Sequence, residues 1–435
     1  MDDEYEKLIR RMNPPRVVVD NDSSAEATVI QVESLNKHGI LLEVVQVLTD
    51  MNLVITKAYI SSDGGWFMDV FNVVDRDGKK IANSRAIDTI KRKIEKSASF
   101  SPSLRGSVGV MPSDKHTSIE LTGKDRPGLL SEVCAVLTCL HCNVVNCEIW
   151  THNSRAAAVL HVTDHPTGGA IEDPERLSTI RDSLSNVLRV GNDDLQAART
   201  AFSSPMFTSR ERRLHQIMFA DRDFERSVSK DQGKRPHVTV MDCGDKDYTI
   251  IAMKSKDRPK LLFDIVCTLT DMQYIVFHGM VKTGKKEAYQ EFYIRHVDGL
   301  PISSDAERER VVQCLEAAIQ RRASEGLELE LCTEDRLGLL ADITRIFREN
   351  GLCIKRAEIS TTNRIARDTF YVTDVTGSSV DPRIVSAIRQ QVGQTALMVR
   401  QNWNYSPKPR EDTTVGFLLN YLWKLPSFKS IRSCS

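Results

Sequence analysis

Four times along this chain, an alternation of apolar and polar residues leads through a short polar turn into a run of apolar residues at helical spacing. The four turns are Asn36-Lys37-His38-Gly39, Asp125-Arg126-Pro127-Gly128, Asp257-Arg258-Pro259-Lys260 and Asp335-Arg336-Leu337-Gly338. A pattern that recurs in this way indicates an internal repeat, so one unit describes the fold of the whole chain.

The second repeat shows the pattern most clearly. Residues 117–121 alternate as a half-buried strand does, and the run after the turn has one apolar helix face. Further strands are predicted from Asn143 and over 156–162, and a second helix over 174–188. This order, β-α-β-β-α-β, is the ferredoxin-like arrangement.

The other three repeats match the second position by position. On the helix face, Val133 corresponds to Val44, Ile265 and Ile343, and Leu137 corresponds to Leu48, Leu269 and Phe347. The strand-like segments 15–19 and 236–240 also occupy the same place before repeats 1 and 3, where we expect each to join a sheet. We therefore predict an α+β protein of four tandem ferredoxin-like domains arranged as two pairs, repeats 1 and 2 followed by repeats 3 and 4.

The repeats divide the chain into six segments. We expect repeat 1 over 15–111, repeat 2 over 115–190, a linker or insertion over 191–235, repeat 3 over 236–325, repeat 4 over 326–402 and a tail over 403–435. An insertion as long as 191–235 is disordered, docks elsewhere or carries function, and the sequence leaves these alternatives open.

Composition limits the classes of partner. The 435 residues include 59 basic and 59 acidic side chains, and this zero net charge gives no broad attraction to nucleic acid or anionic membranes. The acidic start is unlike a secretory signal, and no apolar stretch approaches the roughly 18 residues of a membrane span. We expect ten reduced cysteines and a location in the cytoplasm or nucleus, without secretion.

Two apparent chemical motifs have simpler interpretations. Cys134, Cys139, Cys142 and Cys147 are close together, but the repeat places three of them at core or near-core positions, so buried thiols are favoured over a zinc site. The segment 279–286 resembles a phosphate-binding loop but lacks its Ser or Thr, and it is interpreted as a hairpin turn. Without a nucleophile beside a base or a metal set, we predict no catalysis and no cofactor.

The strand, the Asp-Arg-Pro-Gly turn and the helix together resemble the ACT domain, a small ligand-binding regulatory module. Four copies without a catalytic domain resemble the plant ACT-domain repeat proteins of the ACR type, from about Pro15 to Trp403. The resemblance implies amino acid binding, nutrient sensing and domains that pair side by side. The repeats also resemble the regulatory tail of the bacterial nitrogen-sensing uridylyltransferase.

The chemistry of the turns suits an amino acid ligand. A helix N-terminus has free N–H groups and a partial positive charge for a carboxylate, and a glycine permits close approach of the backbone. A neighbouring Asp or Asn can accept hydrogen bonds from the ligand ammonium.

In serine-sensing ACT domains that this chain resembles, an Asn opens the turn and a second Asn follows eighteen residues later. Repeat 2 has Asp125 and Asn143 at that spacing, whereas repeats 1, 3 and 4 have Val54, Ile275 and Cys353 at the second position. The candidate ligand-binding residues are Asp125, Arg126, Gly128, Leu129 and Asn143 in repeat 2, Asn36 and Gly39 in repeat 1, and Asp335 and Gly338 in repeat 4. Repeat 3 is the weakest candidate because Lys260 replaces the glycine.

Structural interpretations of the same residues remain open. Each turn Asp could be a helix N-cap, each turn Arg could be solvated or paired with a neighbour, and each glycine could serve packing alone. Asn143 could be an ordinary turn residue.

We predict a non-catalytic regulatory protein that binds an amino acid, as a small-molecule ligand, at a domain interface and changes its affinity for a protein partner. The alternative is a structural interaction scaffold with vestigial ligand sites. Homo-oligomers could form through the sheets. The apolar segment 415–425 could lie on a membrane, dock on a partner or cover this protein's own domains, and the last option is favoured.

Overall fold

The fold was obtained as a computed structural model. It describes residues 14–36, 38–63, 65–99, 116–189, 199–203, 209–225, 236–243, 247–284, 286–323 and 326–400. The apolar segment 415–425 and the rest of the expected tail lie outside these residues.

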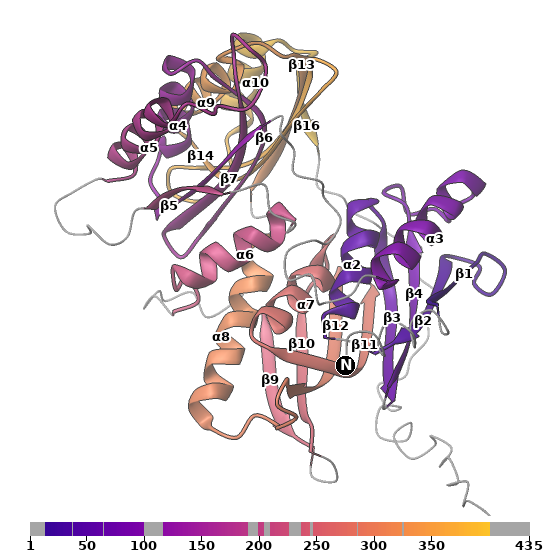
Figure 1. Cartoon of the computed structure of the whole chain (residues 1–435). Coiled ribbons are helices and arrows are strands. Elements are labelled where there is room, and N and C mark those ends of the chain that lie inside the picture. The colour runs from indigo at the N-terminus through magenta and orange to yellow at the C-terminus, as the bar shows by residue number, and fades with distance from the viewer. Residues whose placement is uncertain are drawn as a thin grey trace, which may run out of the picture. The chain divides into compact units, whose positions relative to one another are not determined.

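The four repeats form the predicted helices and strands (Figure 1). Repeat 1 contains β1 (Arg16–Asp20), β2 (Thr28–Leu35), α2 (Ile40–Asp50), β3 (Val54–Asp63), β4 (Trp66–Val74) and α3 (Ser84–Ser99). Repeat 2 contains β5 (Thr117–Lys124), α4 (Leu129–Cys139), β6 (Cys142–His152), β7 (Arg155–Asp164), α5 (Pro174–Leu188) and β8 (Arg199–Ser203). The second helix of repeat 2 has the predicted bounds, with Asp173 as its N-cap and Pro174 in its first turn.

The second half of the chain repeats this series. Repeat 3 contains β9 (His237–Asp242), β10 (Thr249–Lys256), α7 (Leu261–Asp271), β11 (Tyr274–Gly284), β12 (Glu287–His296) and α8 (Asp305–Arg321). Repeat 4 contains β13 (Leu327–Glu334), α9 (Leu339–Glu349), β14 (Leu352–Thr362), β15 (Ile365–Asp374), α10 (Pro382–Val392) and β16 (Leu397–Arg400). The segment 191–235 contributes β8 and α6 (Arg210–Ala220).

Among the described residues, two eight-stranded sheets join the repeats in pairs, but the partners are not neighbours in sequence. One sheet has the order β1-β2-β4-β3-β11-β12-β10-β9, which joins repeat 1 to repeat 3. The other has the order β16-β13-β15-β14-β6-β7-β5-β8, which joins repeat 4 to repeat 2. The prediction of two pairs is confirmed, whereas the prediction that adjacent repeats pair with each other is wrong. A hydrophobic pattern specifies which face of a strand is buried, not which strand lies beside it.

The outer strands explain how repeat 3 lacks a last strand of its own. In repeats 2 and 4 the edge position beside the first strand is held by β8 and β16, which follow the second helix. In repeats 1 and 3 the same position is held by β1 and β9, which come before the repeat. The expectation that these extra strands join a sheet is confirmed.

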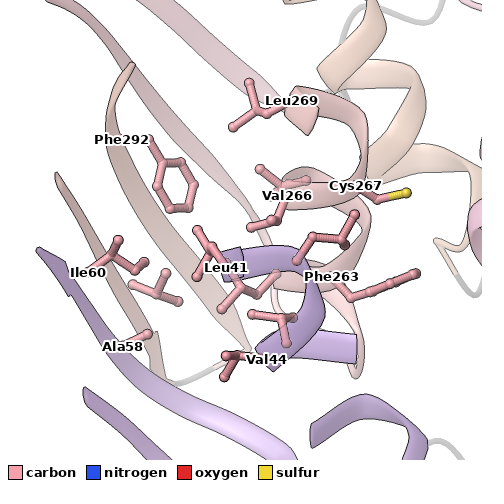
Figure 2. Packing of buried hydrophobic residues seen from close by; sticks show 14 of the residues in the cluster. Leu41, Val44, Ala58, Ile60, Phe263, Val266, Cys267, Leu269 and Phe292 are labelled. Atoms are coloured by element: carbon pink, nitrogen blue, oxygen red, sulfur yellow. The ribbon is translucent and has the colours of Figure 1, made fainter. Parts of the chain in front are cut away.

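Each pair of repeats shares one hydrophobic core. The equivalent helix residues Val44 and Ile265 are fully buried, and they belong to the core of the first sheet. Figure 2 shows Leu41 and Val44 of repeat 1 near Phe263, Val266 and Phe292 of repeat 3. The second sheet has its own core, which includes Val133 and Ile343.

The segment 279–286 is part of a β-hairpin, as predicted. β11 and β12 pair antiparallel up to Gly284 and Glu287. A Cβ atom at Gly279 would lie 2.6 Å from Phe292 Cδ1 and 3.0 Å from Ile60 Cδ1, and Figure 2 shows these two side chains in the shared core. The glycine therefore permits close packing between repeats 1 and 3.

Helix α6 lies against the outer face of the second sheet. Its apolar side chains Leu214, Ile217 and Met218 form a small cluster with Trp150 of β6 and with residues of β7. The same helix also contacts α7 of repeat 3. Within the described residues, this part of the 191–235 segment therefore acts as a docking element.

Candidate functional site

The four turns have the same backbone. In each, the first residue donates its backbone N–H to a residue in the hairpin between the second and third strands of the repeat, at 2.8–2.9 Å. The fourth residue is the N-cap and is left-handed, with φ of 85° at Gly39, 83° at Gly128, 64° at Lys260 and 81° at Gly338. None of these four residues forms a side-chain capping bond.

The structure settles two interpretations that the sequence left open, one for the turn Asp residues and one for the turn Arg residues. The interpretation of the turn Asp residues as N-caps is wrong, because the cap lies three positions later. The turn arginines do pair with neighbours: Arg126, Arg258 and Arg336 each contact the acidic residue six positions later in the first turn of the helix. Arg126 also donates to the carbonyl oxygen of Val187 at 3.1 Å.

A cavity of about 180 Å³ lies between the turn of repeat 2 and the second strand of repeat 4. Of the sequence candidates, Asp125, Arg126, Gly128 and Leu129 all line it. Repeat 4 contributes Thr344, Arg348, Leu352, Cys353, Ile354, Lys355 and Val375. A single water molecule needs roughly 10–15 Å³, so the cavity has room for a small molecule.

The N-terminus of α4 forms one wall of this cavity. Leu130 and Ser131 line it, and their amides belong to the first turn, where a helix has no backbone acceptors of its own. Gly128 is needed at the cap for two reasons: its φ is left-handed, and a Cβ atom would lie 2.7 Å from Arg348 Cδ. This end of α4 is therefore suited to an anionic group.

Two groups of opposite charge lie at the edge of the cavity. Asp125 Oδ2 is 3.9 Å from Lys355 Nζ, and their side chains are 22% and 41% exposed. Burial raises the pKa of Asp125, and the charge of Lys355 partly offsets this effect. The arrangement offers one anion and one cation to a ligand that carries both.

Lys355 was missed by the sequence reasoning, and a β-bulge accounts for its position. The register of β14 against β15 shifts between Ile354 and Arg356, and equivalent shifts occur in β3, β6 and β11. The bulged residue is Thr56, Val145, Phe277 and Lys355 in repeats 1 to 4. An alignment of these four positions would have shown that only repeat 4 has a charged residue there. It would not have shown that a bulge changes the direction of the Lys355 side chain.

Asp125 and Asn143 belong to two different sites. Asn143 Nδ2 donates to Asp335 Oδ2 of repeat 4, at a long distance of 3.5 Å. Cys353, which has the position of Asn143 in repeat 4, instead lines the cavity beside Asp125. Because β6 and β14 pair antiparallel, each turn faces the second strand of the partner repeat. The two residues at the eighteen-residue spacing therefore belong to two separate sites, one at the turn of repeat 2 and the other at the turn of repeat 4.

Repeats 1 and 4 each have a buried carboxyl group on the third strand, Asp69 on β4 and Asp368 on β15. Asp69 and Asp368 are each 1% exposed and accept a backbone hydrogen bond at 3.3 Å, from Ser61 and Ser360 respectively. Burial raises the pKa of Asp69 to about 8 and that of Asp368 to about 7. Gly338 faces Thr138, whose Cγ2 would be 3.2 Å from an added Cβ, and Asn36 and Gly39 form the turn before α2.

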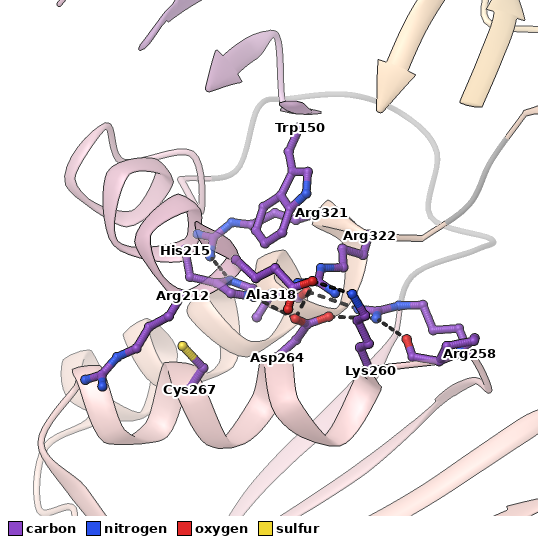
Figure 3. A network of polar contacts seen from close by, with 12 residues as sticks. Trp150, Arg212, His215, Arg258, Lys260, Asp264, Cys267, Ala318, Arg321 and Arg322 are labelled. Carbon is purple, nitrogen blue, oxygen red and sulfur yellow. Dashed lines mark hydrogen bonds and ion pairs between the residues drawn. The ribbon is translucent and has the colours of Figure 1, made fainter. Parts of the chain in front are cut away.

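The turn of repeat 3 is tied to other parts of the chain. Lys260 forms an ion pair with Glu211 of α6, and Arg258 donates to Asp264 at 2.7 Å. Figure 3 shows Lys260, Arg258 and Asp264 together with His215, Arg321 and Arg322 between α6, α7 and the end of α8. Asp264 is fully buried, and although burial alone would raise its pKa, Arg322 and Arg258 hold that pKa well below its usual value.

Three of the four neighbouring cysteines of repeat 2 are buried thiols. Cys134, Cys142 and Cys147 are buried, whereas Cys139 is exposed. Burial raises the pKa of Cys134 to about 12 and that of Cys142 to about 11, which disfavours the thiolate that binds metals. Among the described residues, no group of three or more His, Cys, Asp or Glu side chains could hold a metal ion. In the same part of the chain, no helix combines the length and apolarity needed to cross a membrane.

Comparisons with known proteins agree with this architecture. The ACR family N-terminal ACT domain matches residues 23–101, and the ACT domain matches residues 328–393. The ACT domain-containing protein ACR6 of Arabidopsis thaliana is 66% identical over 432 residues, which cover 97% of this chain and 99% of that protein. The ACT domain-containing protein ACR4 of the same plant is 57% identical over 438 residues, with coverage of 98% and 96%.

A more distant match is a bifunctional uridylyltransferase/uridylyl-removing enzyme of Rhodospirillum rubrum. It is 26% identical over 228 residues, which cover 51% of this chain and 22% of that enzyme. From the near full-length identity to the Arabidopsis proteins, the chain belongs to the ACR family of ACT domain-containing proteins.

Proposed function

We propose that this protein is a non-catalytic regulator that binds an α-amino acid in the cavity between repeats 2 and 4. The observation that carries the proposal is the cavity itself, which has Asp125 and Lys355 at its edge and the N-terminus of α4 in its wall. The ligand ammonium would bind Asp125. The ligand carboxylate would bind the first-turn amides of α4, near Lys355.

The electrostatics of Asp125 support this orientation. Burial disfavours its ionised form, so a ligand ammonium that replaces part of the lost hydration would restore that form. Arg126 is engaged by Glu132 through two hydrogen bonds of 2.8 and 2.5 Å. Its role at the site would be to hold the turn rather than to bind the ligand carboxylate.

A ligand in this cavity would touch both repeats, because α4 belongs to repeat 2 while α9 and β14 belong to repeat 4. Binding would therefore favour one packing of the two repeats over another and, through it, one affinity for a protein partner. The size of that effect is limited by the difference in ligand affinity between the two arrangements.

The test is a calorimetric titration of the intact protein with each of the twenty amino acids. We expect at least one of them to bind, and we expect Asp125→Ala to abolish the binding heat. The matched control is Asp257→Ala, which makes the same change at the same position of repeat 3 and should leave binding intact. If no amino acid binds at millimolar concentration while a protein partner still binds, the chain is an interaction scaffold instead.

A further inference from the structure

The third strand of repeat 2 has unusually small side chains on its buried face. The inward residues of β7 that line the cavity are Ala156, Ala158 and Leu160, and all three are buried. Ala158 lies opposite Leu121 of β5 in the sheet register.

The same register identifies the equivalent residues in the other repeats. Asp69 lies opposite Val32, Gln290 opposite Met253 and Asp368 opposite Leu331. These three side chains are larger than alanine, and each is buried. The counterparts of Leu160 are Phe71, Phe292 and Phe370. Repeat 2 therefore lacks side-chain volume at two successive inward positions.

The space that remains is apolar at its buried end. Ala158 lies there with Leu121, Val133 and Ile149, which are 3–6% exposed, whereas Asp125 and Lys355 lie at the more exposed end. These four side chains offer no hydrogen-bond partner, so a polar ligand side chain placed among them would lose hydration without compensation, which is unfavourable. Two buried hydroxyl groups also line the cavity: that of Thr344 already donates to the carbonyl oxygen of Leu340 at 2.7 Å, and Ser131 lies in the first turn of α4. An apolar side chain would gain from burial.

We propose that the cavity accepts an amino acid with an aliphatic side chain, of the size of valine, leucine, isoleucine or methionine, and that Ala158 sets the permitted size. The proposal rests on the proposed function and adds the class of ligand to it. The charged end of the cavity holds the ammonium and carboxylate, and the buried end holds the side chain. Asp69, Gln290 and Asp368 occupy the corresponding sheet position in the other three repeats.

The experiment is a calorimetric titration of the full chain with leucine, isoleucine, valine and methionine, and separately with serine, glutamine and aspartate. We expect the best aliphatic ligand to bind at least about tenfold more tightly than any of the polar ones, since a methylene group in a hydrophobic pocket contributes roughly tenfold or more. Ala158→Val should weaken the binding of leucine by about tenfold and the binding of valine by less. Gln290→Val places the same side chain at the same position of repeat 3 and should leave both affinities unchanged.

The possible failures are distinct. Tighter binding of serine or glutamine than of leucine overturns the aliphatic assignment and leaves the proposed function standing. Absence of binding by every amino acid overturns both. Wild-type selectivity in Ala158→Val overturns the role of Ala158. If circular dichroism shows that this variant is unfolded, the nearly isosteric Ala158→Ser gives the decision, because its hydroxyl should weaken leucine binding about tenfold without altering the fold.

Discussion

The turns of repeats 2 and 3 share the residues Asp-Arg-Pro and the same left-handed cap, yet their surroundings differ completely. The repeat 2 turn borders a cavity that repeat 4 completes. The repeat 3 turn has Lys260 at the cap, and this lysine is paired with Glu211 of α6. The same local sequence thus produces the same backbone, while distant residues decide whether the helix N-terminus is left for a ligand or used to hold the chain together.

The ion pairs of the two turns show the same contrast. In repeat 2, Glu132 is 39% exposed and pairs with Arg126. In repeat 3, the equivalent Asp264 is fully buried, accepts hydrogen bonds from Arg258 and His215 and lies 3.4 Å from Arg322. A buried charge depends on its partners far more than an exposed one does.

The largest expected effect comes from removing one partner of the buried network. Asp264→Ala would leave Arg258 buried without its carboxylate and would remove one of the two carboxylates that pair with Arg322, so it should lower the free energy of unfolding by about 3–5 kcal/mol. The matched change Glu132→Ala should lower it by less than about 1 kcal/mol, because that pair is partly exposed. Urea denaturation of both variants measures the difference, and equal effects would refute the contrast between the two turns.

A smaller effect is expected at Asp69, the buried carboxyl group on β4 of repeat 1. Asp69 has a raised folded-state pKa of about 8, so its contribution to stability is fully present below its unfolded pKa near 4 and is lost as pH rises through about 8. Asp69→Asn mimics the protonated carboxyl and should stabilise the protein at pH 8 by on the order of 1–3 kcal/mol, with little change at pH 4. Denaturation at both pH values tests this, with exposed Asp88→Asn as the control. A pH-independent effect would contradict it.

The smallest effects are expected at the left-handed caps. Gly128→Ala and Gly39→Ala should each lower the free energy of unfolding by about 1–2 kcal/mol, because both positions have positive φ. Only Gly128→Ala should also weaken amino acid binding, since its Cβ would meet Arg348 beside the cavity, whereas nothing lies within 4 Å of a Cβ at Gly39. Equal calorimetric affinities in the two variants would show that close approach at Gly128 does not matter.

Much of the fold could be predicted because hydrophobic periodicity records local structure directly. The helix Pro174–Leu188 and the buried helix residues Val44, Ile265 and Ile343 follow from spacing and capping alone. The joining of β3 to β11 and of β6 to β14 could not, since each of these strands has an ordinary pattern and any of them could pair with another.

The candidate site was only partly visible for a related reason. Four of the five residues predicted in repeat 2 line one cavity, because they belong to a single turn and helix. Asn143 instead lies beside Asp335 in the turn of repeat 4, because each of these two turns faces the second strand of the partner repeat. Lys355 reaches the cavity because of a β-bulge, and Ala158 leaves space because its side chain is smaller than those at the equivalent positions. Both features become apparent only when equivalent positions of the repeats are compared in three dimensions.

The interleaved order of the repeats has a consequence for any attempt to divide the protein. Each sheet takes one half from the first two repeats and the other half from the last two. A chain cut between α6 and β9 gives two fragments, each with two unpaired strand edges, at β3 and β6 or at β11 and β14. Neither fragment is a finished unit, and the natural way to recover the native assembly is complementation of the two fragments in one cell.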